Sequence, residues 1–237
     1  MVARSDLLYK IPAGISSKNA STICIAAHTA SDALLNVIGL GFPPADVPGI
    51  SVSGKGILIW GGASSVGIMA TQIARAAGFQ YIFVTASTKN HNDMKAGQKP
   101  LGIELAIAFD TVGKGTTNHG PPTGPSGPEL TRLALSASNP GDLRLACTLP
   151  VPADSDFGFC ASFRPKGSLN AMGAPQDPNS SGRVRKVMEH LLANDKERLK
   201  LPVVTTITGT KAGISGIRRA AEGKMSLEKL GLEHPLD

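Results

Sequence analysis

The clearest signal in the chain is a strand–helix–strand pattern of apolar positions between residues 56 and 85. Residues 56–60 read Gly-Ile-Leu-Ile-Trp and residues 81–85 read Tyr-Ile-Phe-Val-Thr. Such continuous apolar runs are typical of strands buried on both faces of a parallel sheet. Between them, apolar residues recur at helical spacing up to Gly78, a residue type that commonly ends a helix. The pattern predicts one βαβ unit.

The remaining sequence alternates between strand-like and helix-like segments in the same way. Further strands are predicted at residues 104–109, 143–149, 168–172 and 203–208, and helices at 18–27, 29–38, after Ser126, at 184–192 and at 214–221. The helix after Ser126 has a well-marked start, because Ser126 and Glu129 have capping-box spacing and Pro128 lies in the first turn. The alternation predicts an α/β fold of the Rossmann type, with a doubly wound parallel sheet.

Composition supports this fold class and excludes several kinds of partner. Apolar residues make up 41% of the 237 residues and aromatic residues only 4%, so the core must consist of small aliphatic side chains. The net charge of +6 is spread along the chain without aromatic interleaving, which argues against nucleic-acid binding. A moderate positive field does favour a ligand that carries phosphate.

The cysteines and the hydrophobic segments indicate a cytoplasmic protein without metal. Cys24, Cys147 and Cys160 are far apart in apolar surroundings, which fits neither a disulfide framework nor a zinc site. No apolar run reaches the length of about 18 residues that a membrane span requires. The first ten residues do not resemble a secretory signal. We therefore expect no membrane partner and a cytoplasmic location.

The glycine-rich segment after the first strand predicts a binding site for a dinucleotide. Residues 61–67 read Gly-Gly-Ala-Ser-Ser-Val-Gly and join the strand to the following helix. A pyrophosphate needs a tight turn, a close backbone approach and helix N–H groups that face the anion. Gly62 can supply the close approach, Gly67 lets the helix pack against the strand, and Ser64 and Ser65 add hydroxyl groups. A structural turn in an unrelated α/β protein is the alternative interpretation.

The end of the second strand indicates which dinucleotide is bound. Chains that bind NAD place an acidic residue there to hold the ribose hydroxyls. Here residues 86–91 read Ala-Ser-Thr-Lys-Asn-His, and the first acidic residue is Asp93. Hydroxyl, amide and cationic groups suit a 2′-phosphate, which a carboxylate would repel. The segment therefore favours NADP(H) as the cofactor, although a solvated polar loop would have a similar sequence.

Several motifs resemble one family. They are Tyr-Lys-Ile-Pro at residues 9–12 with Thr29-Ala30 downstream, the glycine block at 54–78, residues 87–90, Phe-Asp-Thr-Val-Gly at 109–113, and the tail at 223–230. Together they resemble the zinc-independent medium-chain dehydrogenases/reductases, in particular the fungal branch of trans-enoyl reductases and toxin-biosynthesis dehydrogenases. The resemblance spans nearly the whole chain, and the glycine block is its most specific part.

The resemblance implies roles for individual residues. The pyrophosphate would be held by Ser64, Ser65, Val66 and Gly67, and the 2′-phosphate by Ser87, Thr88, Lys89 and Asn90. Thr148 and Leu149 would lie near the nicotinamide, to which Lys229 and Leu230 would return. His28, Thr29, Asn170 and Gly173 would line the substrate pocket, although ordinary core packing explains these four positions equally well. No catalytic acid or base is identified, and a general-acid role for His28 is a guess.

Two departures from the family pattern suggest a shortened chain. Family members begin with a GroES-like β-rich domain, and here residues 1–50 would be only its remnant together with linking helices. Residues 51–175 would form the NADP-binding Rossmann domain, with one strand–helix unit missing near residues 96–102. Residues 176–237 would supply C-terminal helices and a strand that return to the catalytic side.

The function expected from these features is NADPH-dependent reduction of an activated C=C bond (enoyl, enone or quinone) or of a carbonyl. The substrate would be a small metabolite of secondary metabolism, such as a polyketide intermediate. Two alternatives remain: a remnant without redox activity that serves as a nucleotide-binding scaffold, and a cyclase or isomerase of a biosynthetic intermediate. A homodimer through the edge strand of the Rossmann sheet, taken to be residues 168–172, is also expected, because unpaired sheet edges favour association.

Overall fold

The fold is that of a parallel α/β sheet with helices on both faces, as the sequence predicts. A computed structural model describes residues 8–87, 103–116, 124–136, 140–169, 175–194, 199–222, 224–225 and 227–233. The main sheet contains β1 (Gly56–Trp60), β2 (Tyr81–Val84), β3 (Ile107–Asp110), β4 (Arg144–Cys147) and β5 (Phe157–Phe159). Their order is β2-β1-β3-β4-β5, and every neighbouring pair is parallel. Only β2 lies beyond β1 on that side of the described sheet, whereas a full Rossmann sheet has two strands there.

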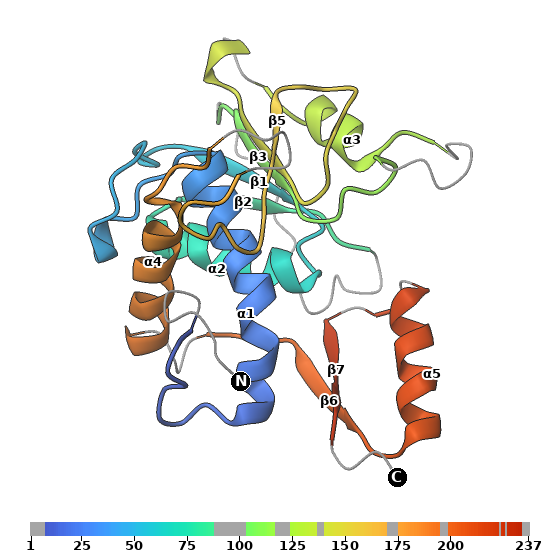
Figure 1. Cartoon of the computed structure of the whole chain (residues 1–237). Helices are drawn as coiled ribbons and strands as arrows, with labels where there is room; N and C mark the ends of the chain where they lie inside the picture. The colour runs from blue at the N-terminus through green and yellow to red at the C-terminus, as the bar shows by residue number, and fades with distance from the viewer. Residues whose placement is uncertain are drawn as a thin grey trace.

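Two hydrophobic cores cover the two faces of this sheet. The larger core lies under α1 (Ser17–Ser31), α2 (Ser65–Ala77) and α4 (Ser180–Asn194), which pack together on one face (Figure 1). The smaller core lies on the other face, beside α3 (Gly127–Leu133). Alternate residues of β1 point to opposite cores, so that Ile57 and Ile59 join the larger core and Leu58 joins the smaller. This burial on both faces explains the continuous apolar run of β1.

The two helices predicted at residues 18–27 and 29–38 are one continuous helical segment. The α-helix α1 runs directly into a π-helical stretch, η2 (Asp32–Val37), without a break. Ser16 caps the start of α1 by accepting a hydrogen bond from the amide of Asn19 at 3.2 Å. Short 3₁₀ turns follow at η3 (Pro43–Ala45) and, before β4, at η5 (Pro140–Asp142).

The prediction of an edge strand at residues 168–172 is wrong for Ser168 and Leu169, the two of these residues that the structure describes. Ser168 and Leu169 lie outside the main sheet, and Leu169 makes only an isolated antiparallel bridge to Pro175. The strand beside β4 is instead β5, at Phe157–Phe159. Residues 170–172 lie outside the described residues.

A small lobe at the C-terminal end of the chain is attached to the main sheet near α2. It consists of β6 (Val203–Ile207), α5 (Thr210–Ala221) and β7 (Glu228–Leu232), with β6 and β7 parallel. The side chain of Gln72 on α2 pairs with the backbone of Lys200, donating to its carbonyl at 2.9 Å and accepting from its amide at 2.6 Å. Before β7, the amide of Leu227 donates to the carbonyl of Ala63 at 3.4 Å. The segments that precede β6 and β7 thus contact the body of α2 and the turn before it.

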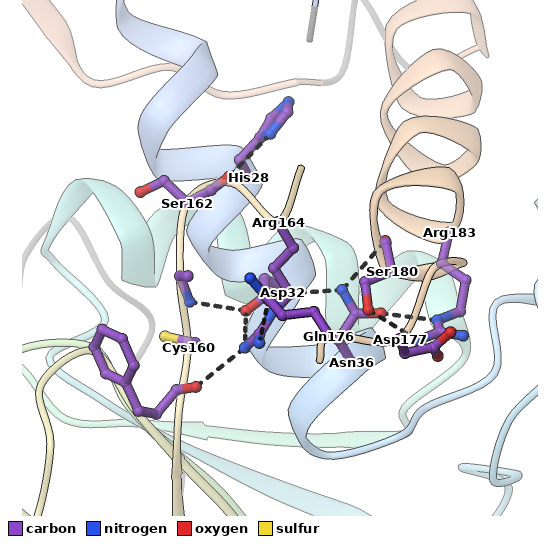
Figure 2. A network of polar contacts seen from close by, with 12 residues as sticks. His28, Asp32, Asn36, Cys160, Ser162, Arg164, Gln176, Asp177, Ser180 and Arg183 are labelled. Atoms are coloured by element: carbon purple, nitrogen blue, oxygen red, sulfur yellow. Dashed lines mark hydrogen bonds and ion pairs between the residues drawn. The ribbon is translucent and has the colours of Figure 1, made fainter. Parts of the chain in front are cut away.

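A buried ion pair joins the π-helical stretch to the chain that leaves β5 (Figure 2). The carboxylate of Asp32, whose side chain is 2% exposed, binds the guanidinium of Arg164 through both oxygens, at 2.5 and 2.8 Å. It also accepts hydrogen bonds from Asn36 Nδ2 at 2.7 Å and from the Ala161 amide at 2.8 Å. A second arm of Arg164 donates to Gln176 Oε1 at 3.0 Å. Such a charge is tolerated inside the protein only because each oxygen has partners.

Removal of the cation from this pair should destabilise the fold strongly. We expect Arg164→Met, which keeps the unbranched apolar part of the side chain and removes the guanidinium, to lower the free energy of unfolding by about 3–5 kcal/mol, because Asp32 stays buried without a counter-charge. Urea unfolding followed by circular dichroism measures the change. The control is Glu189→Gln, which breaks the exposed Arg185–Glu189 pair and should cost no more than about 0.5 kcal/mol. A loss of under about 1 kcal/mol in Arg164→Met would contradict the assigned role.

Candidate dinucleotide-binding site

Residues 61–64, called the glycine turn below, lie at the carboxyl end of β1, between the ends of two neighbouring strands. Gly61 has a φ of +79°, which residues with a side chain rarely adopt. Its amide donates to Thr85 Oγ1 at 3.0 Å, and the amide of Gly62 donates to the Thr85 carbonyl at 2.8 Å. Thr85 directly follows β2, so these bonds fix the turn against β2 on one side, while β3 lies on the other. The turn therefore sits at the point where the strand order reverses, where open α/β sheets bind ligands.

Gly67 allows α2 to start directly over the turn. A Cβ atom at Gly67 would collide with the carbonyl oxygen of Gly61 and would lie 2.7 Å from the Cα of Gly62. Both obstacles are backbone atoms, which cannot move aside as a flexible side chain could. The close approach of helix and strand that was predicted for Gly67 is thus present in the structure.

The first turn of α2 presents backbone N–H groups at the carboxyl edge of the sheet. Ser64 is the N-cap, with extended backbone, and its Oγ accepts from the Gly67 amide at 2.9 Å. The amides of Ser65 and Val66 have no carbonyl one turn earlier within the helix. Both residues are half-buried and so remain within reach of a ligand. Amides without a partner inside the helix, together with the helix dipole, make this end of α2 suitable for an anion.

Thr111 holds the cap in place and was not assigned a role from the sequence. Its hydroxyl lies 2.8 Å from the Trp60 carbonyl and 2.8 Å from Ser64 Oγ. A carbonyl can only accept, so the single hydrogen of the Thr111 hydroxyl goes to Trp60 or Gly61 and Ser64 donates to Thr111. The hydroxyl hydrogen of Ser64 is thereby used within the protein. Ser64 consequently shapes the anion site rather than offering its own hydroxyl hydrogen to the ligand.

Asp110 bends the chain so that Thr111 reaches the glycine turn. Asp110 is fully buried at the end of β3, and its Oδ1 accepts from the amides of Val112 and Gly113, each at 2.9 Å. Oδ2 has no hydrogen-bond partner within the described residues, and burial raises the pKa of the carboxyl group. The Phe-Asp-Thr-Val-Gly motif marked this segment in the sequence, but only the fold places Thr111 on the cap of α2.

Thr148 and Leu149 lie at the same edge, directly after β4. The Thr148 amide continues the β3–β4 ladder by donating to the Asp110 carbonyl at 3.1 Å. Both residues are half-buried. A Cβ at Gly113 would lie 2.9 Å from the Leu149 Cβ, so these two loops are in close contact. The residues expected near the nicotinamide therefore share one edge of the sheet with the glycine turn.

His28 and Thr29 meet the chain that continues from β5. Thr29 Oγ1 lies 2.8 Å from the Ile25 carbonyl and 2.8 Å from Ser162 Oγ. His28 Nδ1 lies 3.1 Å from the Ser162 carbonyl. Burial lowers the pKa of the His28 imidazole, which is therefore neutral at neutral pH and is a poor proton donor.

The remaining predicted residues are only partly placed. Ser87 is exposed shortly after β2, whereas Thr88, Lys89, Asn90, Asn170 and Gly173 lie outside the described residues. Lys229 and Leu230 lie on β7, in the small lobe. The side chain of Leu230 packs against α5, because a Cβ at Gly216 would lie 2.9 Å from the Leu230 Cδ1 atom. It is Leu227, just before β7, whose backbone contacts the glycine turn.

No candidate metal site was found in the described parts of the chain. Groups of three or more His, Cys, Asp or Glu side chains that could hold an ion do not occur there. The three cysteines are free thiols. Among the described helices, none has both the length and the apolar character needed to cross a membrane.

Comparison with known proteins relates the chain to fungal reductases. No family model matches it. A zinc-type alcohol dehydrogenase-like protein of Schizosaccharomyces pombe is 26% identical over 194 residues, which are 80% of this chain and 49% of the relative. The trans-enoyl reductase ACTTS2 of Alternaria alternata is 26% identical over 97% of this chain and 68% of its own length. The trans-enoyl reductase himH of Aspergillus japonicus is 38% identical over 89 residues, or 38% of this chain and 25% of the relative.

Two solved structures that share the fold are named as an oxidoreductase and an enoyl reductase. The yhdH oxidoreductase from Salmonella enterica, solved in complex with NADP, aligns with a TM-score of 0.53 at 19% identity, covering 97% of this chain and 67% of that one. The CurK enoyl reductase aligns with a TM-score of 0.51 at 15% identity over 94% of this chain and 64% of that one. The relatives and the shared fold confirm the resemblance that the motifs indicate. The chain spans about half the length of the Schizosaccharomyces relative.

Substitution of Gly67 should disrupt this site. We expect Gly67→Ala to lower the free energy of unfolding by about 1–3 kcal/mol, because the added methyl meets backbone atoms. The matched control is Gly182→Ala in α4, where a Cβ would meet nothing within 4 Å and where helix propensity favours alanine by up to about 1 kcal/mol. Thermal or urea unfolding of both variants measures the difference. Equal stability of the two variants would contradict the close packing described here.

Proposed function

We propose that this relative of fungal trans-enoyl reductases binds NADP(H) at the glycine turn and reduces an activated C=C bond or a carbonyl of a small metabolite. The observation that carries the proposal is the first turn of α2, which starts at the switch point of a parallel sheet and whose leading amides have no partner inside the helix. The names of the relatives and the NADP complex of the yhdH oxidoreductase support the same reaction class.

In this proposal the chain supplies binding and orientation. The amides of Ser65 and Val66 would hold the pyrophosphate, while Ser64 and Thr111 keep the start of α2 over the turn. Thr148 and Leu149, at the end of β4, would position the nicotinamide. Bound NADPH would supply the hydride, because the protein has no group of its own that can do so.

The preference for the phosphorylated cofactor rests on residues that follow β2. Ser87, Thr88, Lys89 and Asn90 offer hydroxyl, cationic and amide groups, and the first carboxylate after β2 is Asp93. A lysine attracts the 2′-phosphate as a point charge. An acidic side chain in the same place would favour the unphosphorylated ribose.

The substrate would approach from the side of β5, where α1 meets Ser162. Thr29 and Ser162 share a hydrogen bond there and offer a small polar wall. His28 is an unsuitable general acid, since it is buried and neutral. The kinship with Alternaria and Aspergillus trans-enoyl reductases suggests an enoyl intermediate of secondary metabolism as the substrate.

A nucleotide-binding protein without redox activity is the second candidate. It is favoured by the short sheet, in which β2 alone lies beyond β1 within the described residues, and by the incomplete coverage of the relatives. Association of two copies through the free edge of β5 stays a prediction, now placed at Phe157–Phe159 instead of residues 168–172. Phe159 is 42% exposed there.

Reversal of the charge at Lys89 tests the cofactor preference. We expect Lys89→Glu to weaken NADPH binding by at least about tenfold, because loss of a charge-assisted contact to phosphate costs about 1.5–3 kcal/mol, and to leave NADH binding unchanged or stronger. Isothermal titration calorimetry with both cofactors measures this. Lys186→Glu, an exposed lysine on α4, controls for net charge. If both variants keep the wild-type preference, the 2′-phosphate site lies elsewhere.

Turnover separates the two candidate functions. The purified protein is mixed with NADPH and with each member of a panel of enones, enoyl thioesters, quinones and aldehydes. We expect oxidation of NADPH with at least one acceptor, measured as the loss of absorbance at the nicotinamide band. Binding of NADPH without oxidation by any acceptor would favour the scaffold, and conversion of a metabolite without any nicotinamide would favour a cyclase or isomerase. Failure to bind either cofactor would refute the glycine turn as a dinucleotide site.

A further inference from the structure

The sheet of the small C-terminal lobe has only two strands within the described residues, β6 and β7, and they run parallel. An isolated pair of strands is at best marginally stable in water, and parallel sheets normally have both faces covered. Here α5 covers one face so closely that a Cβ at Gly216 would lie 2.7 Å from Ile207 Cδ1. Figure 1 shows the lobe projecting from the rest of the chain. The lobe therefore has the features of an incomplete sheet.

The outer edge of β6 is a row of backbone groups without a partner strand. The amide of Val203 donates to the carbonyl of Leu227, which directly precedes β7, at 3.0 Å. The backbone groups of successive residues in a strand point to opposite sides, so those of Val204 and Thr206 point away from β7. No described strand lies on that side of β6. Val203 is 67% exposed and Thr206 is exposed as well, so solvent reaches both ends of the strand.

The sequence of β6 favours pairing with a further strand. Its five residues read Val-Val-Thr-Thr-Ile, and all of them are β-branched. Such residues fit strands well. Natural edge strands are kept from pairing by charged side chains, proline or bulges, and β6 contains neither a charge nor a proline. The strand β7 carries Glu228 and Lys229. The edge of β6 is therefore better suited than that of β7 to accept another strand.

A second copy of β6 is the strand that matches this edge. Across a two-fold axis a strand meets itself in antiparallel direction, so any charge on it would lie close to a like charge, and β6 has none. With Thr205 on the axis, Val204 lies opposite Thr206 of the second copy, and their outward backbone groups bond to each other. Val203, which is 67% exposed, then lies opposite Ile207 of the second copy. This apolar cross-strand pair would stabilise the contact.

We propose that β6 pairs with β6 of a second copy of this chain, in antiparallel direction about a two-fold axis at Thr205. The pairing joins two lobes into one continuous sheet, which a lone pair of strands needs for stability. Two short strands bury a small area, so the association is weak and depends on concentration. The surface is separate from the start of α2 and from the edge of β5, and the proposal does not rest on the proposed function.

Mass measurement of the full chain over a dilution series tests the pairing. Size-exclusion chromatography with light scattering should show association that is lost on dilution. Thr206→Lys places a lysine on the exposed edge of β6 and should raise the dissociation constant at least about tenfold, because the dimer carries the change twice. Ser215→Lys adds the same charge to the exposed side of α5 and should have no effect.

Phe159→Lys, at the edge of β5, separates this contact from pairing through the main sheet and should still form the β6 dimer. Melting followed by circular dichroism reports whether each variant folds. A wild-type monomer at every concentration, an unchanged dissociation constant in Thr206→Lys, or a monomeric Phe159→Lys would overturn the proposal.

Cross-linking tests the register independently. Thr205→Cys places a thiol on the axis, where the facing Cα atoms of an antiparallel pair without mutual hydrogen bonds lie about 4.5 Å apart, within reach of a disulfide. Val203→Cys is the matched control, since it lies opposite Ile207 rather than another cysteine. Both changes are made together with Cys24→Ser, because the other two cysteines are buried. Under mild oxidation only Thr205→Cys should give a covalent dimer. Equal cross-linking of both variants, or none in Thr205→Cys, would contradict the proposed pairing.

Discussion

The architecture depends on how closely the first turn of α2 approaches the end of β1. Three glycines make this contact, since a methyl group at Gly67 would meet the backbone of Gly61 and Gly62. The contact brings the unpaired amides of α2 to the carboxyl edge of the sheet, where β3 and β4 also end. The loop after each strand then adds its own element: Thr111 after β3 holds the cap, and Leu149 after β4 packs against that loop. A single steric requirement therefore decides where ligand-binding groups can gather.

Near β5, the carboxyl edge of the main sheet is held in place by an ion pair rather than by close packing. Asp32 lies on the π-helical stretch that continues α1, and its pairing with Arg164 draws the chain after β5 against that helix. The same chain carries Ser162, which bonds to both His28 and Thr29. π-Helical turns inside α-helices are rare and occur often at functional sites. Here the turn places one carboxylate where it holds Ala161 and Arg164 of the segment that follows β5.

The sequence predicted what local patterns determine and missed what distant contacts determine. The βαβ unit and the Ser126–Glu129 capping box follow from residues close in sequence, and both are present. The strand β5 was missed because Phe-Gly-Phe is short and contains a glycine, which weakens strands. Gly158 is there for a long-range reason, since a Cβ would collide with Val37 on the helix that follows α1. Likewise, nothing local to Thr111 reveals that it holds the Ser64 cap, and residues 88–90, on which the cofactor preference rests, lie outside the described residues.

Within the described sheet, the β2 side differs from the centre in how deeply its strands are buried. All four residues of β2 are half-buried, whereas all four of β3 are buried, because β3 lies between β1 and β4 and β2 lies at the edge of the described sheet. The larger core, formed by α1, α2 and α4 with β1 and β3, does not rely on a further strand. The contacts that hold the start of α2 come from Thr85, Thr111 and Ser64. The start of α2 is therefore held by contacts from β1, the end of β2 and the end of β3, so the geometry of the proposed anion site is set by the centre of the described sheet rather than by its β2 edge.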